Sequence, residues 1–377
     1  MASEPAPPAP PPIEAAAAPA APTPRLTPEL AFAPPAVADP TLSPDGRLVA
    51  WRVPEEPSAL RVRGVDGAGD GLAVPAAGAE AGDVVTWAWG AEGGRLWVVR
   101  RLPGGLSVEA VELAVPLPEG GAAGAGVEAT SVRPLLLAED GEPAIVAVAA
   151  GPPEEALVAL RRPEADTHVV FAVPAEGGRP VERARGGADV ERWLADDAGE
   201  LRAAVLAPGD GSRRLVRVAG GRVAEPLLTC GAEETCRALG LDAAGTRLAL
   251  APDHGGAGRV GLAFLDLASA TLRRAGREAA ADPADETAPV RRDLGGALFA
   301  ADGTLLATWP AGEPFRVDVD DPAFAAAWER LAPALPTGGV ELVAASGDRR
   351  RLLALAAGAV LLLDLDRGEV RELLRLR

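Results

Sequence analysis

The stretch Ser43-Pro44-Asp45-Gly46-Arg47-Leu48-Val49-Ala50-Trp51 decides the predicted fold. It places a tight acidic-glycine turn directly before an apolar strand. An Asp-Gly pair supplies the positive-φ position that a tight hairpin needs, and the Asp side chain can bond back to nearby backbone. One such turn is an ordinary hairpin, so the fold prediction depends on whether the pattern recurs.

The pattern does recur along the chain, at near-regular spacing. Further copies are Ala91-Glu92-Gly93-Gly94, Glu139-Asp140-Gly141, Asp196-Asp197-Ala198-Gly199, Asp242-Ala243-Ala244-Gly245, Ala301-Asp302-Gly303 and the degenerate Ser346-Gly347-Asp348-Arg349. Aligned on the turn residue, the seven copies stand at positions 46, 94, 141, 199, 245, 303 and 349. Each interval fits one four-stranded blade of a β-propeller with ordinary loops.

Apolar strands flank these turns on both sides. An inner strand precedes the turn, as in Val84–Trp89, and an outer hairpin follows in several repeats, as in Leu262–Leu267 before Thr271. The sequence therefore predicts an all-β fold, a seven-bladed β-propeller of four-stranded blades, over residues 37–377. The alternatives are a six- or eight-bladed ring and a pair of β-sandwiches.

Two segments depart from the repeat. Residues 1–36 begin with a Pro/Ala-rich tract that has little to bury, and they are expected to form a disordered tail or linker. Residues 321–335 predict one short helix, because Asp321 suits the N-cap, Pro322 suits the first helical position, and Phe324, Trp328 and Leu331 form an apolar stripe.

The charge balance argues against several classes of partner. The net charge of this acidic protein is −17, and its 37 basic residues are scattered arginines, so we expect no binding to nucleic acid or to an anionic membrane surface. The longest apolar run, Leu352–Leu363, is too short to span a bilayer and predicts a buried hairpin.

The two cysteines, Cys230 and Cys236, lie close together in sequence and are predicted as a possible disulfide, with a pair of free thiols as the alternative. A disulfide would favour a periplasmic or extracellular setting over a cytoplasmic one. Neither histidine is near them, so a metal site there is not expected.

Three stretches resemble the N-terminal propeller of the prolyl oligopeptidase family, in its bacterial dipeptidyl- and acylaminoacyl-peptidase-like branch. They are Thr41–Trp51, Trp193–Arg202 and the run from Asp321 to Asp348. The Ser-Pro-Asp-Gly turn is shared with TolB-like propellers, which are the runner-up family. The resemblance covers residues 26–374 and implies a propeller that gates substrates for a following α/β-hydrolase domain.

The resemblance does not extend to a catalytic site. The sequence holds no Gly-x-Ser-x-Gly elbow, and Ser107, with Gly105 before it and Glu109 after it, does not complete one. His168 and His254 therefore have no such serine to serve, and both are expected to be structural or solvent-facing. We predict no catalytic residue in this chain, and no cofactor.

Two acidic segments are candidates for binding sites. Some members of the family hold the peptide amino terminus with propeller glutamates, but Glu154-Glu155 matches no such motif and predicts a solvated loop after Pro152-Pro153. The run Asp318-Val319-Asp320-Asp321 offers carboxylates for calcium, yet it lacks the Gly and bidentate Glu of a calcium loop. No metal site is predicted.

These observations leave three hypotheses for function. The first is a non-catalytic interaction module that binds a peptide or protein of unknown identity. The second is the propeller half of a truncated or split serine peptidase, working with a separate hydrolase domain that would begin after Arg377. The third is a metal-dependent propeller enzyme such as a lactonase.

Overall fold

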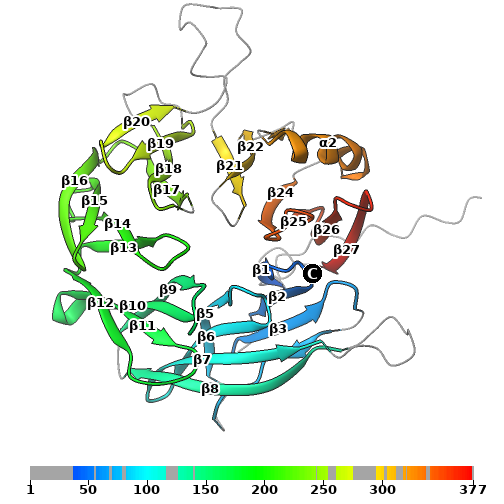
Figure 1. Cartoon of the computed structure of the whole chain (residues 1–377), viewed down its shortest axis with the longest axis horizontal. Coiled ribbons are helices and arrows are strands. Elements are labelled where there is room, and N and C mark those ends of the chain that lie inside the picture. Colours follow the sequence, from blue (N-terminus) through cyan, green and yellow to red (C-terminus); the bar gives the residue numbers. More distant parts are fainter. Residues whose placement is uncertain are drawn as a thin grey trace, which may run out of the picture. The chain divides into compact units, whose positions relative to one another are not determined.

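The computed structural model describes residues 37–54, 57–67, 70–78, 82–115, 126–138, 141–242, 244–253, 260–274, 294–300, 304–310, 317–319, 321–336 and 340–375. Their strands form consecutive antiparallel sheets that are the seven blades of a β-propeller (Figure 1). This confirms the predicted fold class. The predicted tail, residues 1–36, lies outside the described residues.

Blades 1 to 3 are built from strands that are consecutive in sequence. Blade 1 contains β1 (Ala38–Leu42), β2 (Leu48–Val53), β3 (Ala59–Gly64) and β4 (Leu72–Ala73). Blade 2 contains β5 (Asp83–Trp89), β6 (Arg95–Leu102), β7 (Gly105–Ala114) and β8 (Glu128–Ala138). Blade 3 contains β9 (Glu142–Ala149), β10 (Glu155–Arg162), β11 (Thr167–Pro174) and β12 (Val181–Gly186), with the 3-10 turn η1 (Pro163–Ala165).

Blades 4 to 7 follow the same order. Blade 4 contains β13 (Val190–Ala195), β14 (Leu201–Leu206), β15 (Arg213–Ala219) and β16 (Arg222–Cys230); blade 5 contains β17 (Cys236–Leu241), β18 (Arg247–Pro252), β19 (Ala263–Asp266) and β20 (Thr271–Arg274). The described strands of blade 6 are β21 (Leu294–Phe299), β22 (Leu305–Pro310) and β23 (Asp318–Val319). Blade 7 contains β24 (Glu341–Ala345), β25 (Arg351–Ala356), β26 (Ala359–Asp364) and β27 (Glu369–Arg375).

Blades 3 and 4 are joined at their outer edges. A parallel bridge pairs Arg185 of β12 with Arg222 of β16, and the Arg185 N–H donates to the carbonyl of Gly221 at 3.0 Å. The two blades therefore form one eight-stranded sheet.

The predicted helix is confirmed as α2 (Pro322–Leu331), followed by the 3-10 turn η3 (Ala332–Ala334). The Asp321 carboxylate caps it by accepting from the Phe324 N–H at 2.9 Å. Phe324, Trp328 and Leu331 are buried in an apolar cluster with blades 6 and 7, so the helix packs onto the propeller. Among the described residues, no helix is long and apolar enough to cross a membrane.

The turn between the first and second strands of a blade, here called the inner turn, has one backbone design in five blades. The N–H of its fourth residue donates to the carbonyl of its first residue, and the fourth residue has a positive φ. The pairs are Gly46–Ser43, Gly93–Gly90, Gly199–Asp196, Gly245–Asp242 and Arg349–Ser346, with φ between 61° and 80°. The seventh copy is therefore degenerate in sequence but not in backbone geometry.

The prediction is wrong for one copy of the repeat. The segment Glu139-Asp140-Gly141 does not form an inner turn, because β8 ends at Ala138 and β9 begins at Glu142, so this segment connects blades 2 and 3. Residues 139–140 lie outside the described residues. The inner turn of blade 3 runs from Ala150 to Glu154 and contains no Asp-Gly pair. Acidic-glycine segments serve both kinds of connection, so composition alone could not separate them.

Apolar clusters fill the seams between neighbouring blades. Six clusters lie between blades 1 and 2, 2 and 3, 3 and 4, 4 and 5, 6 and 7, and 7 and 1. Alternate residues of each central strand point to opposite seams, so one strand contributes to two clusters. In β6, for example, Leu96 and Val98 face blade 1, while Trp97 and Val99 face blade 3.

The inner turns of blades 1 and 7 each begin with a buried serine, Ser43 and Ser346, whose hydroxyl group should stabilise the fold. The Ser43 hydroxyl donates to Asp45 at 2.6 Å and accepts from the Leu48 N–H at 2.9 Å, and Ser346 makes the equivalent bonds with Asp348 and Arg351. Ser43→Ala should lower the free energy of unfolding by about 1–3 kcal/mol, because the buried Leu48 N–H loses its side-chain acceptor.

Urea unfolding measures this loss, and Ser212→Ala is the matched control. Ser212 makes the same kind of bond to Asp210 but in an exposed turn, so its removal should change stability by less than about 0.5 kcal/mol. Equal effects of the two substitutions would contradict the role assigned to the buried serine.

Candidate functional site

An open hollow of about 330 Å³, lined by apolar side chains, lies where the inner strands β1, β5, β21 and β24 end. Residues from blades 1, 2, 6 and 7 line it: Leu42, Pro44, Trp89, Ala297–Ala300, Val343–Ala345 and Gly347. None of these side chains carries a charge. A concave apolar site of this size is suited to a few uncharged side chains or a small apolar ligand.

The aromatic wall of this hollow is fixed by hydrogen bonds. The indole N–H groups of Trp87 and Trp89 both donate to the hydroxyl oxygen of Thr41, at 3.2 and 3.0 Å. Thr41 belongs to β1 and the tryptophans to β5, so the contact also ties blade 1 to blade 2. Because both indole N–H groups are already paired, Trp89 presents an apolar surface to the hollow.

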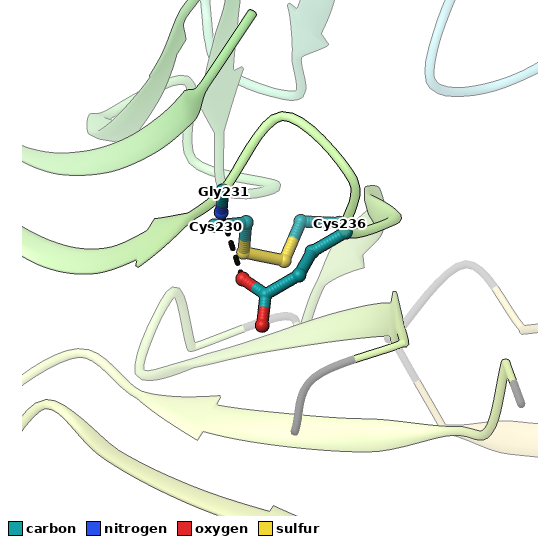
Figure 2. The surroundings of a disulfide bond; sticks show 4 residues. Cys230, Gly231 and Cys236 are labelled. Atoms are coloured by element: carbon teal, nitrogen blue, oxygen red, sulfur yellow. Dashed lines mark hydrogen bonds between the residues drawn. A yellow bond between two sulfur atoms is a disulfide. The ribbon is translucent and has the colours of Figure 1, made fainter. Parts of the chain in front are cut away.

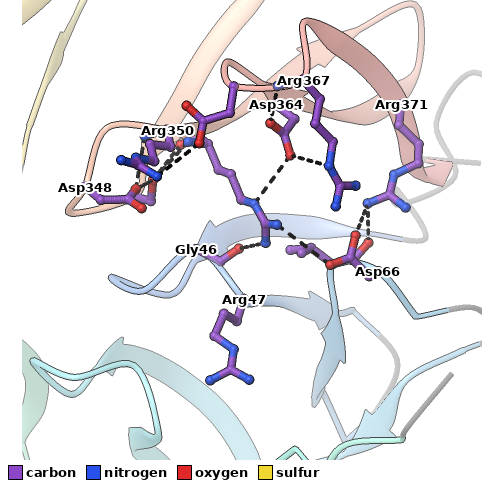
Figure 3. Close-up of polar contacts among 12 residues, drawn as sticks. Gly46, Arg47, Asp66, Asp348, Arg350, Asp364, Arg367 and Arg371 are labelled. Carbon is purple, nitrogen blue, oxygen red and sulfur yellow. Dashed lines mark hydrogen bonds and ion pairs between the residues drawn. The ribbon is translucent and has the colours of Figure 1, made fainter. Parts of the chain in front are cut away.

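An arginine–aspartate network spans the seam between blades 7 and 1 (Figure 3). Arg351 donates to the Gly46 carbonyl at 2.9 Å and lies 3.8 Å from Asp66 and 3.7 Å from Asp364. Arg371 donates to Asp66 at 2.9 Å and to the Val65 carbonyl at 2.8 Å. The network joins residues that are about 305 positions apart in the sequence, near the two ends of the propeller.

A second hollow, of about 300 Å³, opens beside this network. Its lining is wholly charged: Asp45, Arg47, Asp348, Arg350, Arg351, Asp364, Asp366 and Arg367. Most of these charges are paired with one another, as in Arg350–Asp366 at 3.2 Å. Because these charges pair with one another, we interpret them as residues that hold blades 7 and 1 together rather than as a binding site for a charged ligand.

The structure corrects the prediction for Glu154. Its side chain is only 14% exposed, and its carboxylate accepts from the Ala91 N–H and the Trp97 indole N–H, each at 2.9 Å, while Arg95 pairs with it at 3.2 Å. Glu154 thus fastens the inner turn of blade 3 to that of blade 2. The solvated-loop prediction failed because the blade 2 partners are about 60 residues away in sequence. Glu155 pairs separately with Arg183 at 3.0 Å.

Ser107 and Asp321, two candidates from the sequence, make hydrogen bonds and ion pairs within the propeller. Ser107 is buried and donates to Glu109 at 3.3 Å, beside the buried Arg100–Glu109 ion pair at 3.0 Å. Asp321 caps α2 and pairs with Arg349 at 3.2 Å, while Asp320 lies outside the described residues. Within the part of the chain that is described, no group of three or more metal-ligating side chains gathers.

The two cysteines are joined as a disulfide, Cys230–Cys236, at the crossover from β16 to β17 (Figure 2). Both are buried in the apolar cluster between blades 4 and 5. Inside the loop, the Gly231 N–H donates to the Glu234 carboxylate at 2.7 Å. The cross-link therefore ties the outer strand of blade 4 to the inner strand of blade 5.

Removing this cross-link should destabilise the protein. The Cys230→Ser/Cys236→Ser variant is expected to lose about 2 kcal/mol of unfolding free energy, since a short closed loop restricts the unfolded chain by roughly that amount. Urea unfolding with and without reductant measures it, and the reduced wild type should approach the variant. Two reactive thiols in the unreduced protein would contradict the disulfide.

His168 is a buried histidine in β11 rather than a surface group. It is 5% exposed, its Nδ1–H donates to the Val190 carbonyl at 2.8 Å, and its ring lies edge-on to Trp193 at 6.0 Å. Burial lowers the pKa of the His168 imidazole below its ordinary value, although the hydrogen bond to Val190 opposes the shift. His254 lies outside the described residues.

This lowered pKa predicts a dependence of stability on pH. Below the unfolded-state pKa of about 6.5, the unfolded chain binds a proton that folded His168 resists, so stability falls as the pH drops below that value. His168→Asn, which keeps a donor for Val190, should be less stable at neutral pH but lose less on acidification. Denaturant unfolding between about pH 7.5 and 5.5 tests this; parallel curves for the two proteins would contradict it.

This chain is similar to known proteins in its structure but not detectably in its sequence. No protein-family model matches the sequence, and no curated protein matches it. A prolyl endopeptidase superposes with a TM-score of 0.54 and 12% identity, over 91% of this chain and 50% of that chain. An acylaminoacyl peptidase from Pyrococcus horikoshii gives 0.52 and 12%, over 91% and 52%.

The β-propeller domain of the Trilobed protease from Pyrococcus furiosus, described as having an open velcro topology, gives a TM-score of 0.56 and 11% identity, over 92% of this chain and 97% of that chain. Among the described residues of the present chain, the sheet of blade 1 contains β1 to β4 and the sheet of blade 7 contains β24 to β27. The chain spans about half the length of the two peptidases. At 11–12% identity these similarities show the fold alone. The chain has a β-propeller fold like the propellers of prolyl endopeptidase and acylaminoacyl peptidase.

Proposed function

We propose that this chain is a non-catalytic propeller that binds an uncharged, apolar segment of a peptide or protein in the hollow at the ends of β1, β5, β21 and β24. The observation that carries the proposal is the hollow itself, whose lining is apolar and whose Trp89 wall is held in place by Thr41. Apolar pockets with a rigid aromatic wall are a common means of peptide recognition.

Two further observations support this function. The fold is that of propellers found in peptidases, which handle peptides, and the sequence contains no Gly-x-Ser-x-Gly elbow. The second candidate, the propeller half of a longer or split serine peptidase, is favoured by the chain spanning about half of those enzymes. A Gly-x-Ser-x-Gly motif in the reading frame following Arg377 would make that candidate the better account.

A substitution inside the hollow tests the proposal. Ala297 lines the hollow, is half-buried and belongs to none of the apolar clusters, so its side chain can be changed with little effect on packing. Ala297→Arg should weaken binding of a fluorescein-labelled peptide of proline, leucine and alanine by about tenfold or more, because the guanidinium would be buried without a partner.

Fluorescence anisotropy measures the affinity, and Ala297→Ser is the matched control, with affinity close to that of the wild type. Thermal unfolding of both variants checks that the fold is kept. Equal affinities of the arginine variant and the wild type, or the failure of any apolar peptide to bind, would refute the proposal. Hydrolysis of a prolyl or acylaminoacyl substrate by the chain alone would refute its non-catalytic part.

A further inference from the structure

The apolar hollow lies along the backbone edges of two inner strands. Its lining includes the consecutive residues Ala297–Ala300 of blade 6 and Val343–Ala345 of blade 7. Successive side chains of a β-strand point to opposite faces of its sheet, so a hollow on one face would contact alternate residues only. Contact with consecutive residues therefore places the hollow beside the edges of β21 and β24.

Both strands lie at the inner end of their sheets. Among the described strands, β21 pairs with β22 and β24 pairs with β25, and each is the first strand in its sheet. The other edge of each strand therefore faces away from the sheet. On such an edge, alternate residues direct both their N–H and their C=O groups outward, where another chain can pair with them.

The inner turn of blade 6 shows which residues these are in β21. The Ala300 N–H donates to the Thr304 carbonyl at 2.8 Å, so this pair is hydrogen-bonded. Bonded residues of an antiparallel pair alternate with residues whose backbone groups point away from the partner strand. The bulge between Leu298 and Phe299 adds its extra residue to β22, so β21 alternates regularly here. Phe299 and Ala297 therefore direct their backbone groups toward the hollow that both residues line.

The same register holds in the three other blades that line the hollow. The N–H groups of Ser43, Gly90 and Ser346 donate to carbonyls across their inner turns, at 2.9, 2.8 and 2.8 Å. The residue before each of them therefore directs its backbone groups away from the partner strand. These three residues, which all line the hollow, are Leu42, Trp89 and Ala345.

The side chains that line the hollow leave recognition to these backbone groups. All of them are hydrocarbon except Trp89, whose indole N–H already donates to Thr41 at 3.0 Å. Four of the lining residues are alanines and one is glycine, and such small side chains leave the neighbouring backbone accessible. A ligand that forms hydrogen bonds in this site would therefore form them with the main chain.

We infer that the ligand is an extended peptide segment that adds to the edge of β21 as a further strand, with main-chain hydrogen bonds to Ala297 and Phe299. β21 is the inner strand whose regular alternation brings two outward-pointing residues to the hollow. In β24, the bulge at Val343 interrupts the alternation. This inference rests on the proposed function and specifies its ligand: an uncharged segment with free amide N–H groups at alternate positions.

Backbone methylation of a peptide tests the inference. The parent is a fluorescein-labelled, proline-free peptide of leucine, alanine and threonine, and each analogue carries one N-methyl group in place of one amide hydrogen. In a strand that pairs along one edge, every second amide points to the partner. Methylation should therefore weaken binding by about tenfold at alternate positions, and by less than about twofold at the positions between them.

Fluorescence anisotropy gives the affinities of the series. Equal affinities for all analogues, or equal losses at every position, would overturn strand addition and leave the proposed function standing, because the parent would still bind. If neither this parent nor the proline-containing peptide binds, the proposed function is refuted and the inference falls with it.

Proline substitution in β21 is the complementary test on the protein. Ala297→Pro removes an N–H that points to the hollow and takes no hydrogen bond from the pairing with β22, so the variant should stay folded and bind the parent peptide about tenfold more weakly. Ala297→Ser keeps the N–H and should bind like the wild type. Thermal unfolding checks the fold, and wild-type affinity in a folded Ala297→Pro variant would overturn the inference. If Ala297→Pro does not fold, the methylated peptides decide.

Discussion

In five of the seven blades, the hairpin of the two inner strands depends on one backbone hydrogen bond, from the fourth residue of the inner turn to the first. It requires a positive φ at the fourth residue, which glycine adopts at little cost. In the four of these turns that have a glycine at this position, the glycine also lies against the neighbouring blade. A Cβ there would stand 3.0 Å from Ser346 at Gly46, 2.8 Å from Asp45 at Gly93, 2.6 Å from Ala149 at Gly199 and 2.8 Å from Asp196 at Gly245. The same residue thus sets the hairpin and the distance between blades.

Much of the fold could be predicted because this hydrogen bond favours a short acidic-glycine sequence that can be recognised at each turn. Acidic-glycine turns located six of the seven inner hairpins, and Asp321-Pro322 located the helix. The inner turn of blade 3 was not predicted, because its sequence is Gly151-Pro152-Pro153-Glu154 and contains no Asp-Gly pair. The nearby pair Asp140-Gly141 lies instead in the connection between blades 2 and 3. The apolar hollow could not be predicted, because its lining comes from strands as distant as β1 and β24 and no short motif encodes their convergence.

Residues that join blades were the least visible in the sequence. Glu154, Asp66 and Arg371 act across seams, and their partners are separated from them by about 60 to 300 residues. Local pattern therefore predicts the blades better than it predicts the strength of the contacts between them.

The eight-stranded sheet of blades 3 and 4 has a consequence for how the propeller can associate with other chains. Outermost strands normally leave unpaired N–H and C=O groups, which invite another strand to add to the sheet. Near Arg185 and Arg222, β12 and β16 turn these edges toward each other. Strand addition by another protein is therefore blocked at this point on the perimeter, and the outer strands of other blades, such as β20 and β27, are the edges left to receive one.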